Sequence, residues 1–222
     1  MPYIITELCT KDGACVEVCP VACIHTTPDS SQFYIDPDIC IECEQCEIVC
    51  PVDAIFLDTK LPAQHEPSID VNTRFFRSNK AAVEPIHLDV AMEMIQVAQS
   101  YAARSGLAVS VAVVDEAGAP IAMGRMDEAH PRTADLAYNK AFTAARFHVP
   151  TAELVQQARR PWMRSLIVQS RGRIIPAGGG IPVADGIAIL GAIGVAGGPR
   201  DEQDILCCRA GLTVLDHEGH QL

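Results

Sequence analysis

The chain has 222 residues, enough for one or two domains, and hydrophobic residues make up 49% of it, which excludes an intrinsically disordered protein. Its formal net charge is -11, so the chain as a whole would repel phosphate groups rather than neutralise them. The composition therefore argues against nucleic acid or an anionic membrane as the partner.

The N-terminal segment MPYIITELCTKDG has no basic region followed by an apolar core, so the sequence predicts no secretory signal and a cytoplasmic protein. The longest nearly uncharged apolar stretch, Gly186 to Gly198, is shorter than the roughly 18 residues of a membrane span. We expect it to be a buried strand.

Eight of the ten cysteines lie between Cys9 and Cys50. In a cytoplasmic chain such crowding favours metal ligation over disulfides. The residues from Cys40 to Pro51 spell C-x2-C-x2-C-x3-C-P. In this motif three thiolates on one loop hold one iron-sulfur cluster and the fourth thiolate ligates a second cluster.

The same spacing occurs 31 residues earlier, with an aspartate in the second position, as Cys9, Asp12, Cys15 and Cys19. The match continues beyond the ligands, because CPVACI at 19–24 corresponds to CPVDAI at 50–55. The region is therefore an internal duplication. Cys23 stands opposite Ala54, and we predict a small buried residue rather than a ligand there.

Exchange of the fourth ligands predicts two clusters. Cluster II, expected to be [4Fe-4S], takes Cys19, Cys40, Cys43 and Cys46. Cluster I takes Cys9, Cys15 and Cys50. For the fourth iron of cluster I, a carboxylate is a weaker ligand than a thiolate. Cluster I is therefore either [3Fe-4S], with Asp12 facing solvent from a turn, or [4Fe-4S] with Asp12 as a ligand.

Residues 1 to about 78 resemble bacterial two-cluster ferredoxins of the 7Fe/8Fe type, and we assign residues 1–80 to this domain. The resemblance implies electron transfer and a tail from Leu61 to Phe76 packed over the cluster core. The first loop departs from the seven-iron pattern, since five residues rather than the usual seven separate Cys9 and Cys15.

The domain is acidic. Residues 1–80 carry 13 acidic and 5 basic side chains, a net charge of -8. This acidic surface is either a solvated face or a docking site for a basic redox partner such as a reductase.

A polar linker is predicted near residues 79–85, and helical and extended segments then follow without strict alternation. The predicted helices are Val90 to Tyr101, Thr133 to Phe147, one beginning at Thr151 and interrupted at Pro161, and Asp201 to Leu215. The predicted strands are Leu107 to Val114 and Ile121 to Met126, which form a hairpin, and Ile187 to Val195. This order predicts an α+β fold.

Five motifs occur in the second part in the order AVVDEAGAP, RMDEAH, NKAFTAA, GGGIPV and GAIGVAGG. On these motifs residues 86–222 resemble the GlcG/HbpS-like family, which includes the C-terminal domain of some corrinoid adenosyltransferases. The one departure noticed is Ala196, where serine is usual. The resemblance implies a profilin-like antiparallel sheet flanked by helices and a homo-oligomer, and some members bind haem.

Several residues of this second domain are candidates for holding a ligand. Arg125, Asp127 and Lys140 could hold an anionic group such as a haem propionate, or could form structural ion pairs. The run Gly178, Gly179 and Gly180 either admits a ligand close to the backbone or forms a tight turn.

Histidines and cysteines complete the candidates. Three histidines could ligate haem iron, or serve as helix caps and surface residues: His87, His130 and His148. Any haem would be non-covalent, because no C-x-x-C-H motif occurs. Cys207 and Cys208 are adjacent on a helix and are expected to be buried small residues. No catalytic residue is predicted.

Three functions follow from these features. The first is an electron-transfer ferredoxin joined to a domain that binds a small ligand, haem or a corrinoid, or docks a partner. The second is a redox enzyme that reduces haem, a corrinoid or a small catabolite. The third treats the second domain as an oligomerisation scaffold.

Overall fold

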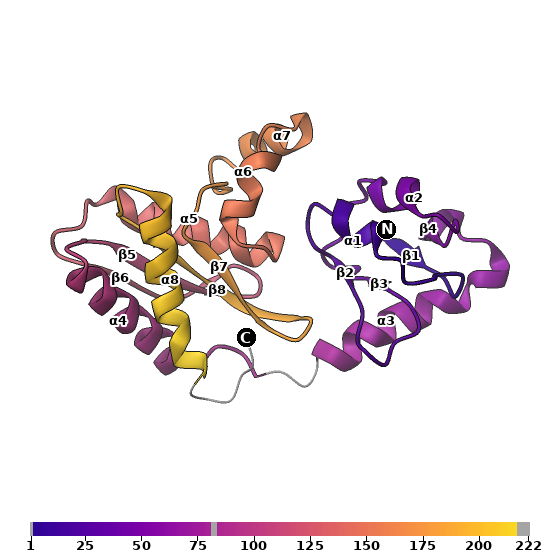
Figure 1. Ribbon diagram of the computed structural model, residues 1–222, viewed down its shortest axis with the longest axis horizontal. Helices are drawn as coiled ribbons and strands as arrows, with labels where there is room; N and C mark the ends of the chain where they lie inside the picture. The colour runs from indigo at the N-terminus through magenta and orange to yellow at the C-terminus, as the bar shows by residue number, and fades with distance from the viewer. Residues whose placement is uncertain (1, 81–83, 217–222) are drawn as a thin grey trace. The chain divides into compact units, whose positions relative to one another are not determined.

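The computed structural model describes residues 2–80 and 84–216. Within it the chain forms two compact units, Met1–Val83 and Glu84–Leu222, each with its own core (Figure 1). Part of the predicted linker, residues 81–83, lies outside the described residues, and residues 79 and 80 belong to a helix.

The first unit is built from the duplicated motif. Its elements are β1 (Tyr3–Ile5), α1 (Ala14–Val18), β2 (Ile24–His25), β3 (Tyr34–Ile35), α2 (Gln45–Val49), β4 (Ile55–Leu57), the 3-10 turns Asp58–Lys60 and Ala63–His65, and α3 (Pro67–Lys80). Helices α1 and α2 begin 31 residues apart, as do strands β2 and β4. The sequence repeat is therefore also a structural repeat.

The two halves of the first unit are joined by exchanged strands. Strand β1 of the first repeat pairs with β4 of the second, with Ile5 opposite Ile55. Strand β2 of the first repeat pairs in the same way with β3 of the second, with Ile24 opposite Ile35. Each two-stranded sheet thus takes one strand from each repeat.

Helix α3 closes the unit over these strands, as expected for the tail. The buried side chain of Asn72 accepts a hydrogen bond from the Ile35 N–H (2.9 Å) and donates one to the Ile35 carbonyl oxygen (2.7 Å). The ring of Phe75 stacks on Tyr34 with centroids 4.0 Å apart. The helix therefore satisfies backbone groups of β3 that would otherwise be buried without partners.

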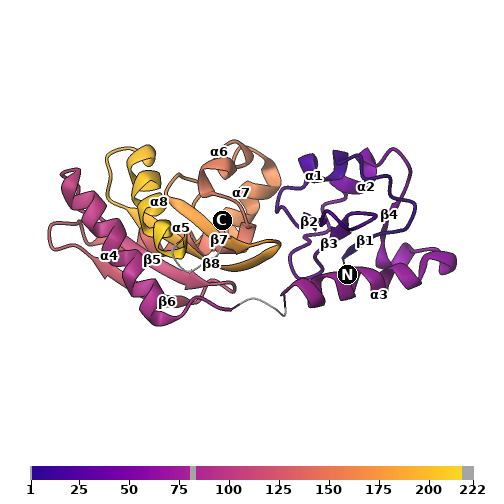
Figure 2. The ribbon, with the colours of Figure 1, turned by 60° about the horizontal axis from the view of Figure 1, so that its bottom comes forward.

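The second unit is an antiparallel sheet with helices on both faces, which confirms the predicted α+β class. Its elements are α4 (Leu88–Arg104), β5 (Ser110–Asp115), β6 (Pro120–Arg125), α5 (Arg132–Phe147), the 3-10 turn Thr151–Glu153, α6 (Leu154–Gln157), α7 (Pro161–Gln169), β7 (Gly180–Asp185), β8 (Ala188–Ala196) and α8 (Asp201–Asp216). The strand order is β6-β5-β8-β7, and the predicted β5–β6 hairpin is present. Helices α4 and α8 cover one face and α5 the other (Figure 2).

Strand β7 was not predicted. Gly180 and Pro182 interrupt its apolar pattern, and proline is tolerated there because β7 is an edge strand.

Among the helices of the described residues, none is long and apolar enough to cross a membrane.

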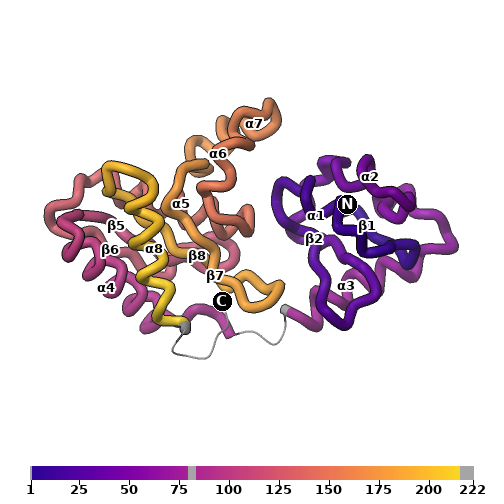
Figure 3. The backbone as a smooth tube through the Cα atoms, viewed as in Figure 1, coloured from indigo at the N-terminus to yellow at the C-terminus, as the bar shows by residue number. Residues whose placement is uncertain are grey.

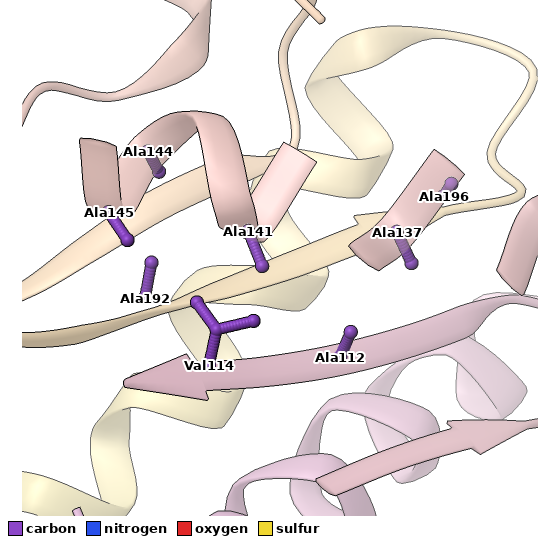
Figure 4. Close-up of a cluster of buried hydrophobic side chains, with 8 residues drawn as sticks. All are labelled: Ala112, Val114, Ala137, Ala141, Ala144, Ala145, Ala192 and Ala196. Carbon is purple, nitrogen blue, oxygen red and sulfur yellow. The ribbon is translucent and has the colours of Figure 1, made fainter. Parts of the chain in front are cut away.

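Small side chains form the core beneath α5. They are Ala112, Val114, Ala137, Ala141, Ala144, Ala145, Ala192 and Ala196 (Figure 4). A Cβ atom on Gly194 would collide with the Ala137 carbonyl oxygen. The helix can therefore approach the sheet closely only because both surfaces carry alanine and glycine.

Candidate functional site

The first unit contains two cavities, and each groups one predicted set of ligands. Cavity I, of about 270 Å³ including its open mouth, is lined by Cys9, Asp12, Cys15 and Cys50 together with apolar side chains. Cavity II, of about 290 Å³, is lined by Cys19, Cys40, Cys43 and Cys46, with Cys23 beside them. Cys50 and Cys19 each lie with the other repeat's residues, as the exchanged fourth ligands require.

The residues that line these cavities suit a polynuclear cluster. In the described part of the chain, no three His, Cys, Asp or Glu side chains converge closely enough to hold a single metal ion. The thiols instead line two cavities, three around cavity I and four around cavity II, with Cys23 beside the latter. All ten cysteines are free, so disulfides do not compete for the thiols. The donor set therefore fits iron-sulfur clusters.

The loops around the cavities direct backbone N–H groups at the ligand sulfurs. The N–H of Lys11 donates to Cys9 Sγ (3.4 Å) and that of Ala54 donates to Cys50 Sγ (3.3 Å). Positive φ angles recur at repeat-related positions, at Lys11 (56°) and Glu42 (56°) for example. This strained backbone turns the amides inward, and such hydrogen bonds stabilise thiolates and tune cluster potentials.

Burial makes two of the cluster thiols poor acids. The pKa of Cys46 is raised to about 12 and that of Cys15 to about 11, in both cases chiefly by burial. A coordinating thiol is deprotonated by the charge of the metal it binds. The thiolates of Cys15 and Cys46 would therefore be stabilised by a cationic occupant of their cavities.

Cys23 is buried as predicted, but it has a contact that the sequence did not reveal. Its Sγ lies 3.4 Å from Cys19 Sγ, and its N–H donates to the same sulfur (3.4 Å). The hydrogen bond with Cys23 lowers the pKa of Cys40 to about 6. Cys23 thus touches two predicted ligands of cluster II, whereas Ala54 occupies the equivalent place in cavity I.

Asp12 borders cavity I and is exposed. Its Oδ1 accepts a hydrogen bond from the Ala14 N–H (2.9 Å), and its Oδ2 accepts one from Thr10 Oγ1 (3.3 Å). Both carboxylate oxygens therefore already hold the turn that precedes α1. This arrangement favours a structural role facing solvent over ligation.

In the second unit, Lys140 is held inside the protein. Its Nζ lies 2.7 Å from Asp204 Oδ2 and donates to the Val195 carbonyl oxygen (3.1 Å), and both charged side chains are buried. Burial raises the pKa of Asp204, and the positive charge of Lys140 opposes that rise. The structure thus places Lys140 in an ion pair between α5 and α8.

The three glycines pack against the same helices. The Gly178 N–H donates to Asp201 Oδ2 (2.7 Å), and the Gly179 carbonyl accepts from Cys208 Sγ (3.2 Å). A Cβ on Gly180 would meet the Lys140 carbonyl oxygen. The run therefore allows β7 to lie close to α5 and α8.

Arg125, Asp127 and His130 remain exposed in the loop between β6 and α5. The Arg125 Nη1 donates to the Ala129 carbonyl oxygen (2.6 Å), and His130 Nδ1 accepts from the Arg132 N–H (3.2 Å). Arg125 is held to the backbone next to His130, at the end of the sheet where β6 ends.

His87 lies far from this group. The adjacent Ile86 packs near Gly191, which pairs with Asp115 at one end of β5, whereas Arg125 pairs with Ser110 at the other end. His148 follows the last residue of α5 in a left-handed conformation (φ 58°). The structure thus leaves Arg125, Asp127 and His130 exposed around one loop and separates His87 from them.

Comparison with known proteins identifies both units. The family described as "Haem degrading protein HbpS-like" matches residues 86–213, and the "4Fe-4S dicluster domain" family matches residues 7–54. "Ferredoxin 7Fe" of Hydrogenibacillus schlegelii is 53% identical over 79 residues, 35% of this chain and 99% of that protein.

Solved structures resemble the second unit. A double mutant of HbpS from Streptomyces reticuli is 34% identical, with a TM-score of 0.54 over 60% of this chain and 88% of that one. A structure described as a PduOC:heme complex is 25% identical, with a TM-score of 0.54 over 59% of this chain and 95% of that one.

Proposed function

Because this chain belongs to the HbpS-like family and carries a ferredoxin electron-transfer domain at its N-terminus, we propose that it passes single electrons to a small ligand held by its second unit. The observation that supports this most is the pair of cysteine-lined cavities with exchanged fourth ligands. When bound, the two clusters supply one-electron chemistry. The chain holds them, excludes water from their apolar faces and tunes them with N–H donors.

For cavity I we propose a [3Fe-4S] centre. Three thiols line it, and the hydrogen bonds of Asp12 to Ala14 and Thr10 support a carboxylate that faces away from iron. The name of the Hydrogenibacillus relative describes a seven-iron protein, which is consistent with one three-iron and one four-iron cluster. Cavity II, with four thiols, then holds [4Fe-4S].

For the second unit we propose haem as the ligand. The solved PduOC complex contains heme and shares this fold. In this chain, exposed His130 could supply a nitrogen ligand, and Arg125 could pair with a propionate. Lys140 is excluded from that role, because its charge already neutralises Asp204.

The second candidate is a redox enzyme that reduces the bound haem as part of its breakdown. The family description, which names haem degradation, favours it over reduction of a corrinoid. We also propose that the second unit forms a homo-oligomer and that a redox protein supplies electrons to the acidic first unit.

Spectroscopy tests the proposal. Anaerobically purified protein should show iron and sulfide in the ratio of one [3Fe-4S] and one [4Fe-4S] cluster, with the EPR signal of an oxidised three-iron centre. Added haem should produce a Soret band that reduction of the clusters shifts. Iron-free protein would overturn the electron-transfer role, whereas clusters without a Soret band would overturn only the haem proposal.

A further inference from the structure

The second unit contains a basic segment that the proposed function does not use. Between Leu154 and Ala184 the sequence has five arginines and no aspartate or glutamate. We call residues 159–173 the arginine segment; its members are Arg159, Arg160, Arg164, Arg171 and Arg173, all exposed. In a chain with a net charge of -11, this is a local reversal of sign.

Helix α7 arranges part of this segment in a row. Arg160, Arg164 and Val168 follow one another at intervals of four residues, so they lie along one side of the helix. Val168 is 77% exposed, whereas Met163 of the same helix is fully buried. The tube view shows α6 and α7 at the periphery of the second unit, away from the four-stranded sheet (Figure 3). The row is therefore an accessible surface with an apolar side chain among cations.

Most of these arginines are not used inside the fold. Arg173 stacks on the Phe142 ring at 3.9 Å and donates to the Tyr138 hydroxyl (3.0 Å). Within residues 2–80 and 84–216, the guanidinium groups of Arg159, Arg160 and Arg164 make no hydrogen bond or ion pair. Their charges are therefore available to a partner.

A complementary surface occurs in the first unit. Glu42, Glu44 and Glu47 are exposed and alternate with the residues that line cavity II; we call them the acidic rim. Beside them, Ile41 is 43% and Ile48 is 72% exposed. The repeat-related positions near cavity I are Lys11, Gly13 and Val16, so only cavity II has this rim.

We propose that the arginine segment docks the acidic rim of a second copy of this chain. Both surfaces combine an exposed aliphatic side chain with charges of one sign, and the signs are opposite. Phosphate-rich partners fit less well, because the rest of the chain is strongly acidic and would repel them. The inference rests on the proposed oligomer and would bring cavity II of one copy to the second unit of another.

A charge swap between two variants tests this docking. One variant carries Arg160→Glu and Arg164→Glu, and the other carries Glu42→Lys and Glu44→Lys. Each variant alone should lose the salt-sensitive self-association of the full-length holoprotein, with a rise of about tenfold or more in its dissociation constant. An equimolar mixture should regain it, because the unchanged arginine segment of the rim variant meets the unchanged acidic rim of the arginine variant.

The mixture isolates docking between copies. Neither variant carries both surfaces unchanged, so docking inside one chain cannot account for recovery. The control mixture pairs Arg104→Glu, Arg146→Glu with Glu66→Lys, Asp70→Lys, which change equally exposed residues and the same net charges. Sedimentation velocity under anaerobic conditions measures all mixtures.

The outcomes are separable. Recovery in the swapped mixture alone supports the proposal. No recovery in the swapped mixture overturns it, and so does equal recovery in the control mixture. A loss of self-association that the arginine variant shows only when anionic vesicles or DNA are present also overturns it. Iron and sulfide content, measured on every variant, shows whether the clusters and hence the electron-transfer function are intact when docking fails.

Discussion

The Sγ atoms of Cys23 and Cys19 lie 3.4 Å apart, so a thiol that is not in the ligand motif touches a predicted ligand of cluster II. The duplication supplies the comparison, because Ala54 at the equivalent position has only its N–H directed at Cys50. The two clusters thus have the same backbone hydrogen bond but differ by one S–H donor.

Replacement of Cys23 by alanine should therefore make cluster II resemble cluster I in this respect. Loss of a weak hydrogen bond of about 0.5 kcal/mol to a thiolate should lower the reduction potential of cluster II by about 20 mV. Protein-film voltammetry measures the shift. Cys207→Ala, which removes a buried thiol from the second unit, should leave both potentials unchanged. An unchanged cluster II potential in Cys23→Ala would show that the S–H group has no electronic role.

Asp12→Cys should complete the thiolate set of cavity I. Because a thiolate is a much better ligand than a carboxylate for iron in a sulfide cluster, the variant should gain about one iron per chain and lose the three-iron EPR signal. Asp12→Asn keeps the shape and the hydrogen bond from Ala14, and should keep the three-iron signal. If the wild-type protein already contains two four-iron clusters, and Asp12→Asn loses iron, then Asp12 is a ligand.

Lys140→Met should leave Asp204 buried without its counter-charge. Removal of one partner of a buried pair costs about 3 to 5 kcal/mol of unfolding free energy. The double variant Lys140→Met, Asp204→Leu should regain most of this stability, because no buried charge remains. Denaturant unfolding followed by circular dichroism checks both. Equal stability of the single variant and the wild type would contradict a buried ion pair.

The cost of Lys140→Met should also depend on pH. Burial raises the pKa of Asp204 in the folded state. The folded protein then binds more protons than the unfolded chain between the unfolded and folded pKa values, so stability falls as pH rises through that interval. Without Lys140 the interval widens, so the difference in stability from the wild type should be smallest in acid and grow upward from the ordinary carboxyl pKa near 3.8. A difference that is constant with pH would indicate lost packing alone.

Asn72→Ala should loosen α3 from the cluster core. It leaves the buried N–H and carbonyl of Ile35 without their partners, at a cost of about 2 to 4 kcal/mol. Bleaching of the cluster absorbance on heating should occur at a lower temperature. Asn79→Ala is the matched control, since the bond that Asn79 makes among the described residues goes to the Phe75 carbonyl in its own helix, and its effect should be small.

The sequence by itself predicted how the cluster cysteines are grouped. The motif places most of each set on one short loop, and the repeat assigns Cys50 and Cys19 to the other half, where the structure places them beside those cysteines. Alternation and helical periodicity likewise predicted the β5–β6 hairpin and the helices of the second unit. Sequence patterns predict these elements because each element is formed by residues that are neighbours in the chain.

The tertiary structure alone decided which candidates remain free to act. Lys140 forms an ion pair with Asp204, 64 residues away in the chain. The glycine run allows the backbone to pack closely where β7 meets α5 and α8. The place of Cys23 against Cys19 also follows only from the folded loop, although the repeat could have suggested it. Such outcomes depend on contacts between distant segments, and burial then sets whether a charged or sulfur-bearing group serves the fold or a ligand.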